Sequence, residues 1–230
     1  MISYVTQTTN TWTGSSGGTT TIVPINTRPS VGNMLIAVIK SGGAGTLTSI
    51  TDPAGNSWVT DASAFASGPG IYIAHTQVLN AYGSTAHLTL NWSASINNNG
   101  MITMEFSGLP SSGFVVDRAG TNSSTTTNTS SVCALSASTT RPADLIITGV
   151  AIGGGTSETI TSPAGYTRQD TSSITADMDV GYQIASSTGT FNNSWSWTAG
   201  AAYAAATVAY LPSSALPNTG RGQFFHFMKV

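Results

Sequence analysis

The side chains that could carry out chemistry are few and widely spaced in this chain. His75 and His87 lie in strand-like segments, and His226 lies near the C-terminus. Metal sites usually bring their histidines together on one helix turn or in one short loop, and these three show no such spacing. We therefore interpret the histidines as structural and predict no metal and no other cofactor.

The acidic residues likewise give no sign of a metal site or a catalytic site. Asp177 and Asp179 lie two residues apart on a predicted strand, so that their side chains project to the same face. Calcium needs several oxygen ligands, and no third acid accompanies this pair in its strand, so we expect a solvated strand edge. Paired catalytic carboxylates must lie about 5–10 Å apart, and the sequence identifies no such pair. We predict that the chain is not an enzyme.

Cys133 is the only cysteine, which rules out an internal disulfide and a zinc site built from several cysteines. It lies in the apolar segment Val132–Leu135, so we expect a small buried core residue.

Five tryptophans offer the best case for ligand binding, because aromatic rings on a sandwich surface can stack on sugars. Trp58 follows a predicted turn, and Trp195 shares a strand face with Trp197. These positions make Trp58 and Trp195 candidates for glycan binding. The alternative is that the tryptophans lie in the core or in subunit contacts, with Trp92 and Trp197 as equivalent core residues of two similar halves.

The C-terminal segment carries a cluster of apolar side chains that are candidates for subunit contacts: Phe224, Phe225, Phe227 and Met228. Exposed apolar clusters of this kind usually mark an interaction site. We expect them to pack on the body of the protein or on a neighbouring subunit.

Charge is scarce throughout the chain. Charged residues make up 7% of the sequence and the formal net charge is −2, whereas an ordinary soluble protein has roughly 25% charged residues. With no basic face, binding to nucleic acid or to an anionic membrane is not expected. Met1–Thr6 has neither the basic nor the apolar region of a secretory signal, and no apolar segment of membrane-spanning length follows.

Alternation of apolar and polar residues predicts the strands that would position these side chains. In His87–Trp92, the residues Leu88, Leu90 and Trp92 share one face, as in a half-buried strand. The continuous apolar run Met34–Lys40 favours a strand covered on both faces. Ala201–Tyr210 is the nearest approach to a helix, but its place in the pattern favours a strand.

A short turn sequence occurs twice and marks an internal duplication. Pro53 and Gly55 recur as Pro163 and Gly165, each time between strand-like segments. Proline presets φ at about −65° and glycine supplies a positive φ, so both copies are predicted to be tight turns. Asn33 and Asp144, each before an apolar run, are a further matching pair.

The prediction is an all-β fold, an antiparallel β-sandwich or jelly roll built from two sequence-similar halves with few or no helices. The expected parts are an N-terminal arm and loop (1–19), a first β-sandwich repeat (20–112), a polar linker (113–131), a second repeat (132–212) and a C-terminal arm (213–230). Whether the halves form one sandwich or two stays open, and we favour one compact body.

The order of these motifs over residues 20–212 resembles repeats in bacteriophage virion surface proteins and bacterial surface proteins. Its elements are Asn or Asp before the apolar run, Gly-Gly, Thr-x-Pro-Ala-Gly, an aromatic-ended strand and a final Leu-Pro. The resemblance implies a jelly-roll or Ig-like sandwich used for display, adhesion or capsid decoration, and it implies no catalytic residues.

We therefore expect a non-enzymatic structural protein, made in the host cytoplasm and placed on the outer surface of a phage virion. It would decorate or cement the capsid, as a homo-oligomer that also contacts other virion proteins such as the major capsid protein. The alternative is a tail-associated receptor- or glycan-binding module that recognises a host surface glycan.

Overall fold

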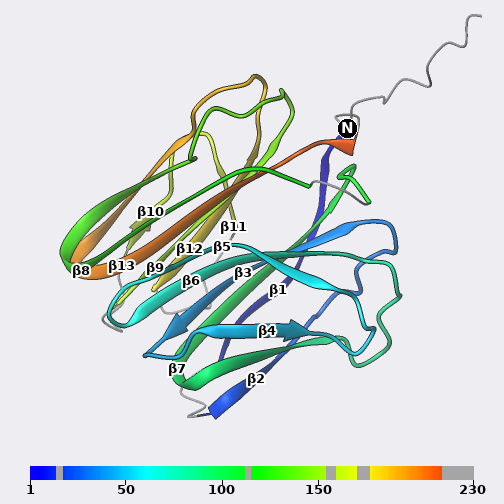
Figure 1. Ribbon diagram of the computed structural model, residues 1–230, viewed down its shortest axis with the longest axis horizontal. Helices are drawn as coiled ribbons and strands as arrows, with labels where there is room; N and C mark the ends of the chain where they lie inside the picture. Colours follow the sequence, from blue (N-terminus) through cyan, green and yellow to red (C-terminus); the bar gives the residue numbers. More distant parts are fainter. Residues whose placement is uncertain (14–17, 112–114, 154–158, 170–176, 214–230) are drawn as a thin grey trace, which may run out of the picture.

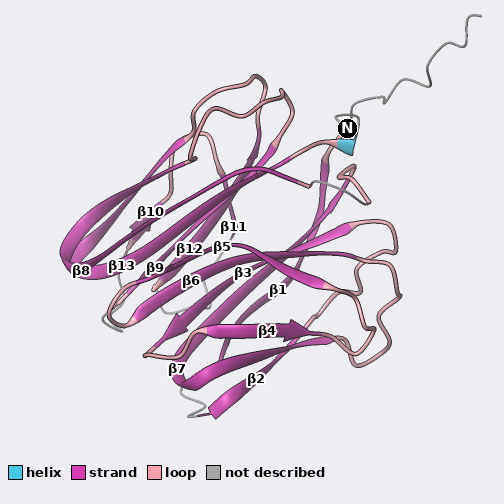
Figure 2. Ribbon diagram, in the orientation of Figure 1, coloured by secondary structure: helices cyan, strands magenta, loops and turns pink. Residues whose placement is uncertain are grey.

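A computed structural model of the chain describes residues 1–13, 18–111, 115–153, 159–169 and 177–213. Apart from a short helical turn at Ser213, the regular elements in these residues are β-strands, and their pairings are antiparallel, in two sheets (Figure 2). The predicted all-β antiparallel fold is confirmed.

The first repeat is built around one long strand. Its strands are β1 (Ser3–Thr13), β2 (Gly18–Pro24), β3 (Met34–Gly42), β4 (Leu47–Thr51), β5 (Trp58–Phe65), β6 (Pro69–Gln77) and β7 (His87–Ser107). The strand order is β1-β7-β3-β6-β5, with β2 and β4 also paired to β7. The first part of β7 pairs with β2 and β4, and its second part pairs with β1 and β3. Strand β7 thus runs through two layers of the repeat (Figure 1).

Side chains between these two layers form the core of the first repeat. Leu88, Leu90 and Trp92 are buried, as the alternation predicts, and they pack with Leu35 and Tyr72 from the other layer. The rings of Tyr72 and Trp92 meet edge to face with centroids 5.9 Å apart. The β7 side chains therefore hold the two layers together.

The second repeat follows the same plan. Its strands are β8 (Val116–Ala134), β9 (Leu145–Ile152), β10 (Ile160–Thr161), β11 (Thr167–Gln169), β12 (Met178–Ile184) and β13 (Asn192–Tyr210). The order is β10-β13-β9-β12-β11, and β8 also pairs with β13. Strand β13 corresponds to β7, since its first part pairs with β10 and its second part with β9. Strand β8 pairs with both parts and so takes the places of β1 and β2 together.

Matching backbone hydrogen bonds show how closely the repeats correspond. In the first repeat, Gly32 N donates to Val78 O at 2.9 Å and Val78 N donates to Asn33 O at 2.9 Å. In the second, Ala143 N donates to Ala185 O and Ala185 N donates to Asp144 O, both at 2.8 Å. The predicted match of Asn33 with Asp144 is therefore present in the backbone.

The two repeats share one apolar core. A single cluster of buried side chains includes Ile36, Ile73 and Phe106 from the first repeat and Ile147 and Tyr210 from the second. Strand β6 contacts both β9 and β13 across this junction. The layers of β3 and β9 are therefore covered on both faces, which explains their continuous apolar sequences. Each repeat keeps its own two layers and its own inner cluster, and the two repeats pack against each other through the shared cluster (Figure 1).

Two predicted boundaries differ from the structure. The N-terminal arm, 1–19, contains β1, which pairs with β7 along the first sheet. The polar linker, 113–131, lies largely within β8, which pairs with β13. Among the described residues, β13 is the only strand that pairs with β8. Many of the Thr and Ser side chains of β8 are exposed. Its sequence therefore lacks the apolar alternation by which a strand is recognised.

The alanine-rich segment Ala201–Tyr210 is strand, as predicted, and forms the second part of β13. Ala204 and Ala206 face the junction between the repeats, and Ala205 faces the core of the second repeat. Small side chains on both faces let the neighbouring layers approach this strand closely.

Candidate functional site

The repeated Pro-Ala-Gly segments form tight turns in both repeats, as predicted. Gly55 has a φ of +74° and Gly165 a φ of +84°, which glycine adopts without steric cost. In the first copy Gly55 N donates to Asp52 O at 3.1 Å. In the second copy the bond is shifted by one residue, from Tyr166 N to Pro163 O at 3.4 Å.

The first turn is anchored by the side chain of Asp52. Its Oδ2 accepts hydrogen bonds from Trp58 Nε1 and from the Tyr82 hydroxyl, each at 2.9 Å. Its Oδ1 accepts one from Asn56 N at 3.2 Å. Burial first, and then the charge of Asp52, raise the pKa of Tyr82 above its ordinary value, so the hydroxyl remains a donor. Trp58 is half-buried in this network, and its only polar atom is bonded within the chain.

The other glycan-binding candidate lies in the core. Trp195 is fully buried between the layers of the second repeat, where it packs with Cys133 and Val150. Its ring is covered and cannot stack on a sugar at the surface. Trp92 and Trp197 are also buried, in the cores of the first and second repeats respectively, as the alternative interpretation of the tryptophans held.

The buried position predicted for Cys133 is confirmed. Burial raises the pKa of its thiol to about 12, so it stays protonated and unreactive at neutral pH.

Asp61, His75 and Tyr210 form a polar cluster at the junction between the repeats. His75 Nδ1 lies 2.7 Å from Asp61 Oδ2, and the Tyr210 hydroxyl donates to the same oxygen at 2.6 Å. Burial, and then the charge of Asp61, raise the pKa of Tyr210 well above its ordinary value. A carboxylate that orients an imidazole occurs in acid–base catalysis, but here the third member is a buried phenol donor. The arrangement ties β5 and β6 to β13.

Lys40, Asp177 and Asn98 form a second polar cluster at the junction. Lys40 Nζ lies 3.1 Å from Asp177 Oδ2, and each side chain is 2% exposed. Asn98 Nδ2 donates to the same Asp177 oxygen at 3.1 Å. A pocket of about 280 Å³ adjoins the cluster and is lined by Lys40, Asn98, Pro69 and several glycines.

The solvated edge expected for Asp177 and Asp179 is wrong, because both carboxylates are buried. Asp179 Oδ2 accepts from the Ser162 hydroxyl at 2.9 Å and lies 2.8 Å from Arg168 Nε. Each aspartate has a basic partner that is distant in sequence, Lys40 for one and Arg168 for the other. The spacing of the two aspartates in the sequence does not predict that each has a basic partner.

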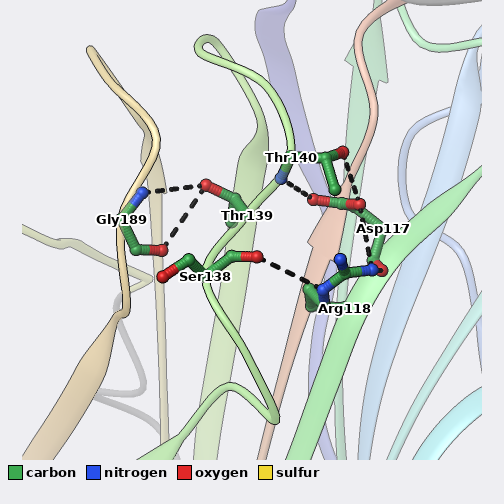
Figure 3. A network of polar contacts seen from close by, with 6 residues as sticks. All are labelled: Asp117, Arg118, Ser138, Thr139, Thr140 and Gly189. Carbon is green, nitrogen blue, oxygen red and sulfur yellow. Dashed lines mark hydrogen bonds and ion pairs between the residues drawn. The ribbon is translucent and has the colours of Figure 1, made fainter.

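A third polar cluster surrounds Asp117 in the second repeat (Figure 3). Its two carboxylate oxygens accept from Thr140 N at 2.6 Å and from Thr140 Oγ1 at 2.7 Å, while Arg118 Nη1 lies 3.4 Å away. Burial alone would raise the pKa of Asp117, but these partners hold it below its ordinary value. Asp144 lies beside Asp117 and is fully buried. Burial first, and then the neighbouring carboxylate of Asp117, raise the pKa of Asp144 to about 7.

The subunit-contact candidates Phe224, Phe225, Phe227 and Met228 lie outside the described residues. Within the described ranges, no group of three or more His, Cys, Asp or Glu side chains is placed to hold a metal ion. The same part of the chain contains no helix long and apolar enough to cross a membrane. Comparison of the chain with protein-family models, curated proteins and solved structures gave no match.

Proposed function

We propose that this chain is a non-enzymatic structural protein of a phage virion, in the first instance a decoration or cement protein of the outer capsid surface. The observation that carries the proposal is the core shared by the two repeats, which makes the chain one continuous body. A protein that braces a particle needs such a body, because separate domains on a linker would move independently.

The outer strands support the same proposal through their uncharged, hydrogen-bonding side chains. Thr20 Oγ1 donates to Asn91 Oδ1 at 3.3 Å, and Asn91 Nδ2 donates to Ser49 Oγ at 2.9 Å. Among these polar groups, matching positions of the two repeats carry exposed β-branched residues, Ile22 at 62% and Val132 at 51%. These faces offer neutral polar and apolar contacts to neighbouring virion proteins.

In this proposal the segment with Phe224, Phe225, Phe227 and Met228 makes the contacts between subunits. Light scattering of the full chain and of a chain that ends at Pro212 tests that role. We expect a closed oligomer from the full chain and a smaller species after truncation. An unchanged mass would show that the C-terminal arm (213–230) does not make the contacts between subunits.

The location is tested separately on particles of the source phage. Mass spectrometry of purified virions should detect the chain, and gold-labelled antibodies should mark the capsid surface in electron micrographs. Absence of the chain from purified virions would overturn the virion proposal.

The second candidate is a tail-associated receptor- or glycan-binding module. The observation that favours it is Trp58, whose ring is only half-buried although its indole N–H is bonded to Asp52. Gold labelling confined to the tail would favour this role. Binding on a glycan array that is lost in Trp58→Ala, but kept in Phe65→Ala, an exposed aromatic residue of the same strand, would support a glycan ligand.

A further inference from the structure

The cluster of Lys40, Asp177 and Asn98 places an amine and a carboxamide on the same carboxylate. The amine of Lys40 and the amide nitrogen of Asn98 both lie 3.1 Å from one oxygen, Asp177 Oδ2. The carboxylate therefore stands between a nucleophile and a possible leaving group. In reactions that replace one amide nitrogen by another, an acid–base group is needed at this place.

Strand pairing, independently of Asp177, places Lys40 and Asn98 on neighbouring strands. Strands β3 and β7 are neighbours, with Lys40 opposite Gly100 and Gly42 opposite Asn97. The register shifts between these two pairs, and Asn98 lies at the shift with a φ of +62°. Lys40 and Asn98 are thus on adjacent strands and reach the same carboxylate from the first repeat, while Asp177 comes from the second.

We propose that Lys40 and Asn98 form an amide cross-link between β3 and β7, with Asp177 as the catalytic residue that moves the proton. The Lys40 amine attacks Cγ of Asn98, so that an Nζ–Cγ bond forms and the Cγ–Nδ2 bond breaks. Asp177 takes a proton from Nζ and delivers it to Nδ2, which leaves as ammonia. In total a lysine ammonium and a carboxamide become one secondary amide and one ammonium ion, and no oxidant or cofactor is required.

The surroundings of Lys40 favour the first step. Burial lowers the pKa of Lys40 to about 8, although the charge and hydrogen bond of Asp177 oppose this shift. A share of the neutral, nucleophilic amine is therefore present near neutral pH. Asp177 Oδ1 has no hydrogen-bond partner in the described part of the chain, which leaves it free to accept a proton.

The adjoining pocket provides a route for the leaving group. It is lined by Lys40 and Asn98 themselves, together with Gly42, Gly43 and Gly153, and so connects the reacting atoms with a space of about 280 Å³. Ammonia is much smaller than this pocket. The cross-link would staple two central strands in a chain whose single cysteine allows no internal disulfide.

The intact mass of the purified full chain tests the cross-link. After allowance for removal of Met1, the measured mass should fall below the calculated one by one ammonia molecule. A protease digest should contain a branched peptide that joins the Lys40 and Asn98 segments. A mass equal to the calculated one would overturn the proposal, and loss of one water instead of ammonia would indicate an amide with Asp177 and overturn the assigned roles.

Variants separate the cross-link from ring closure at Asn99-Gly100, which also releases ammonia. Lys40→Arg keeps a positive charge beside Asp177 but has no amine nucleophile, so it should show the full calculated mass, as should Asp177→Asn. Asn97→Ala, at an exposed position next to Asn98, should still lose ammonia. Persistent loss of ammonia in Lys40→Arg would contradict the proposal. The peptide map of the wild-type chain decides the matter even where a variant does not fold.

Discussion

Tyr210 packs the edge of its ring against His75, across the junction between the two repeats. Their ring centroids lie 5.8 Å apart and the planes meet at 76°. Phe106 and Tyr182 make a matching contact, at 5.3 Å and 77°, in which the repeats have exchanged roles.

Strand register shows that these two contacts are equivalent. Phe106 lies opposite Met34 and Tyr210 lies opposite Leu145, the first residues of β3 and β9. His75 lies opposite Ile36 and Tyr182 lies opposite Ile147, two residues further along. A contact that recurs with the partners exchanged is the property of a two-fold interface. The junction is therefore built like the interface of a symmetric dimer, within a single chain.

Removing the hydroxyl of Tyr210 should weaken this junction. In Tyr210→Phe the buried Asp61 loses one donor, and we expect the free energy of unfolding to fall by about 1–3 kcal/mol. Urea denaturation followed by tryptophan fluorescence measures the change. A cycle with Asp61→Asn and the double variant isolates the pair, and a coupling below about 0.5 kcal/mol would show that the bond contributes little to stability.

Stability should depend on pH through Asp144. Its pKa is raised from 3.8 to about 7 in the folded chain, so the folded state keeps a proton that the unfolded state releases. The resulting stabilisation is fully present below about pH 4 and is lost as the pH rises to about 7. The charged neighbours that set this behaviour are Asp117, Arg118 and Arg141.

The variant Asp144→Asn tests this pH dependence, because an amide resembles the protonated acid. The first repeat already has Asn33 at the corresponding position, where its Nδ2 donates to Glu105 Oε1 at 2.6 Å. Urea midpoints measured from pH 4 to pH 8 should fall less steeply in Asp144→Asn than in the wild type. Parallel curves for the two proteins would assign the pH dependence to other groups.

Ala143→Gly should stabilise the chain. Ala143 has a φ of +66°, and its counterpart Gly32 has a φ of +95°. The left-handed region costs a non-glycine residue about 1–2 kcal/mol, and the greater freedom of an unfolded glycine offsets about 0.5–1 kcal/mol of the gain. We expect a small rise in melting temperature. Gly32→Ala should lower it, and a rise there would contradict the argument from φ.

Adding a side chain at Gly149 should strain the contact between the repeats. A Cβ at this position would lie 2.9 Å from Ile71 Cδ1 and 3.0 Å from Val38 Cγ1, both in the first repeat. Gly149→Val should therefore destabilise the chain by about 1–3 kcal/mol in urea denaturation. Gly189→Val is the matched control, since the atom nearest to a Cβ at that position, Phe191 Cε2, is 4.0 Å away. Equal stability of both variants would argue against close contact at Gly149.

The sequence by itself determined the fold class, the duplication and much of the core. Turn chemistry at Pro53 and Gly55 acts within four residues, and the alternation around Leu88 and Leu90 reflects a strand with one buried face. The apolar run at Met34 required cover on both faces. These signals are local, so they can be read without knowing which strands pair.

Only the tertiary structure decided which polar residues meet. Lys40 and Asp177 lie in different repeats, and their contact depends on how two layers pack across the junction. Most of strand β8 was predicted as a linker for a related reason. A strand with many exposed positions needs no apolar alternation, so β8 is recognised only by its pairing with β13. Pairing and packing bring together residues that are far apart in the chain. The spacing of residues along the sequence does not show which of them lie close together in the folded structure.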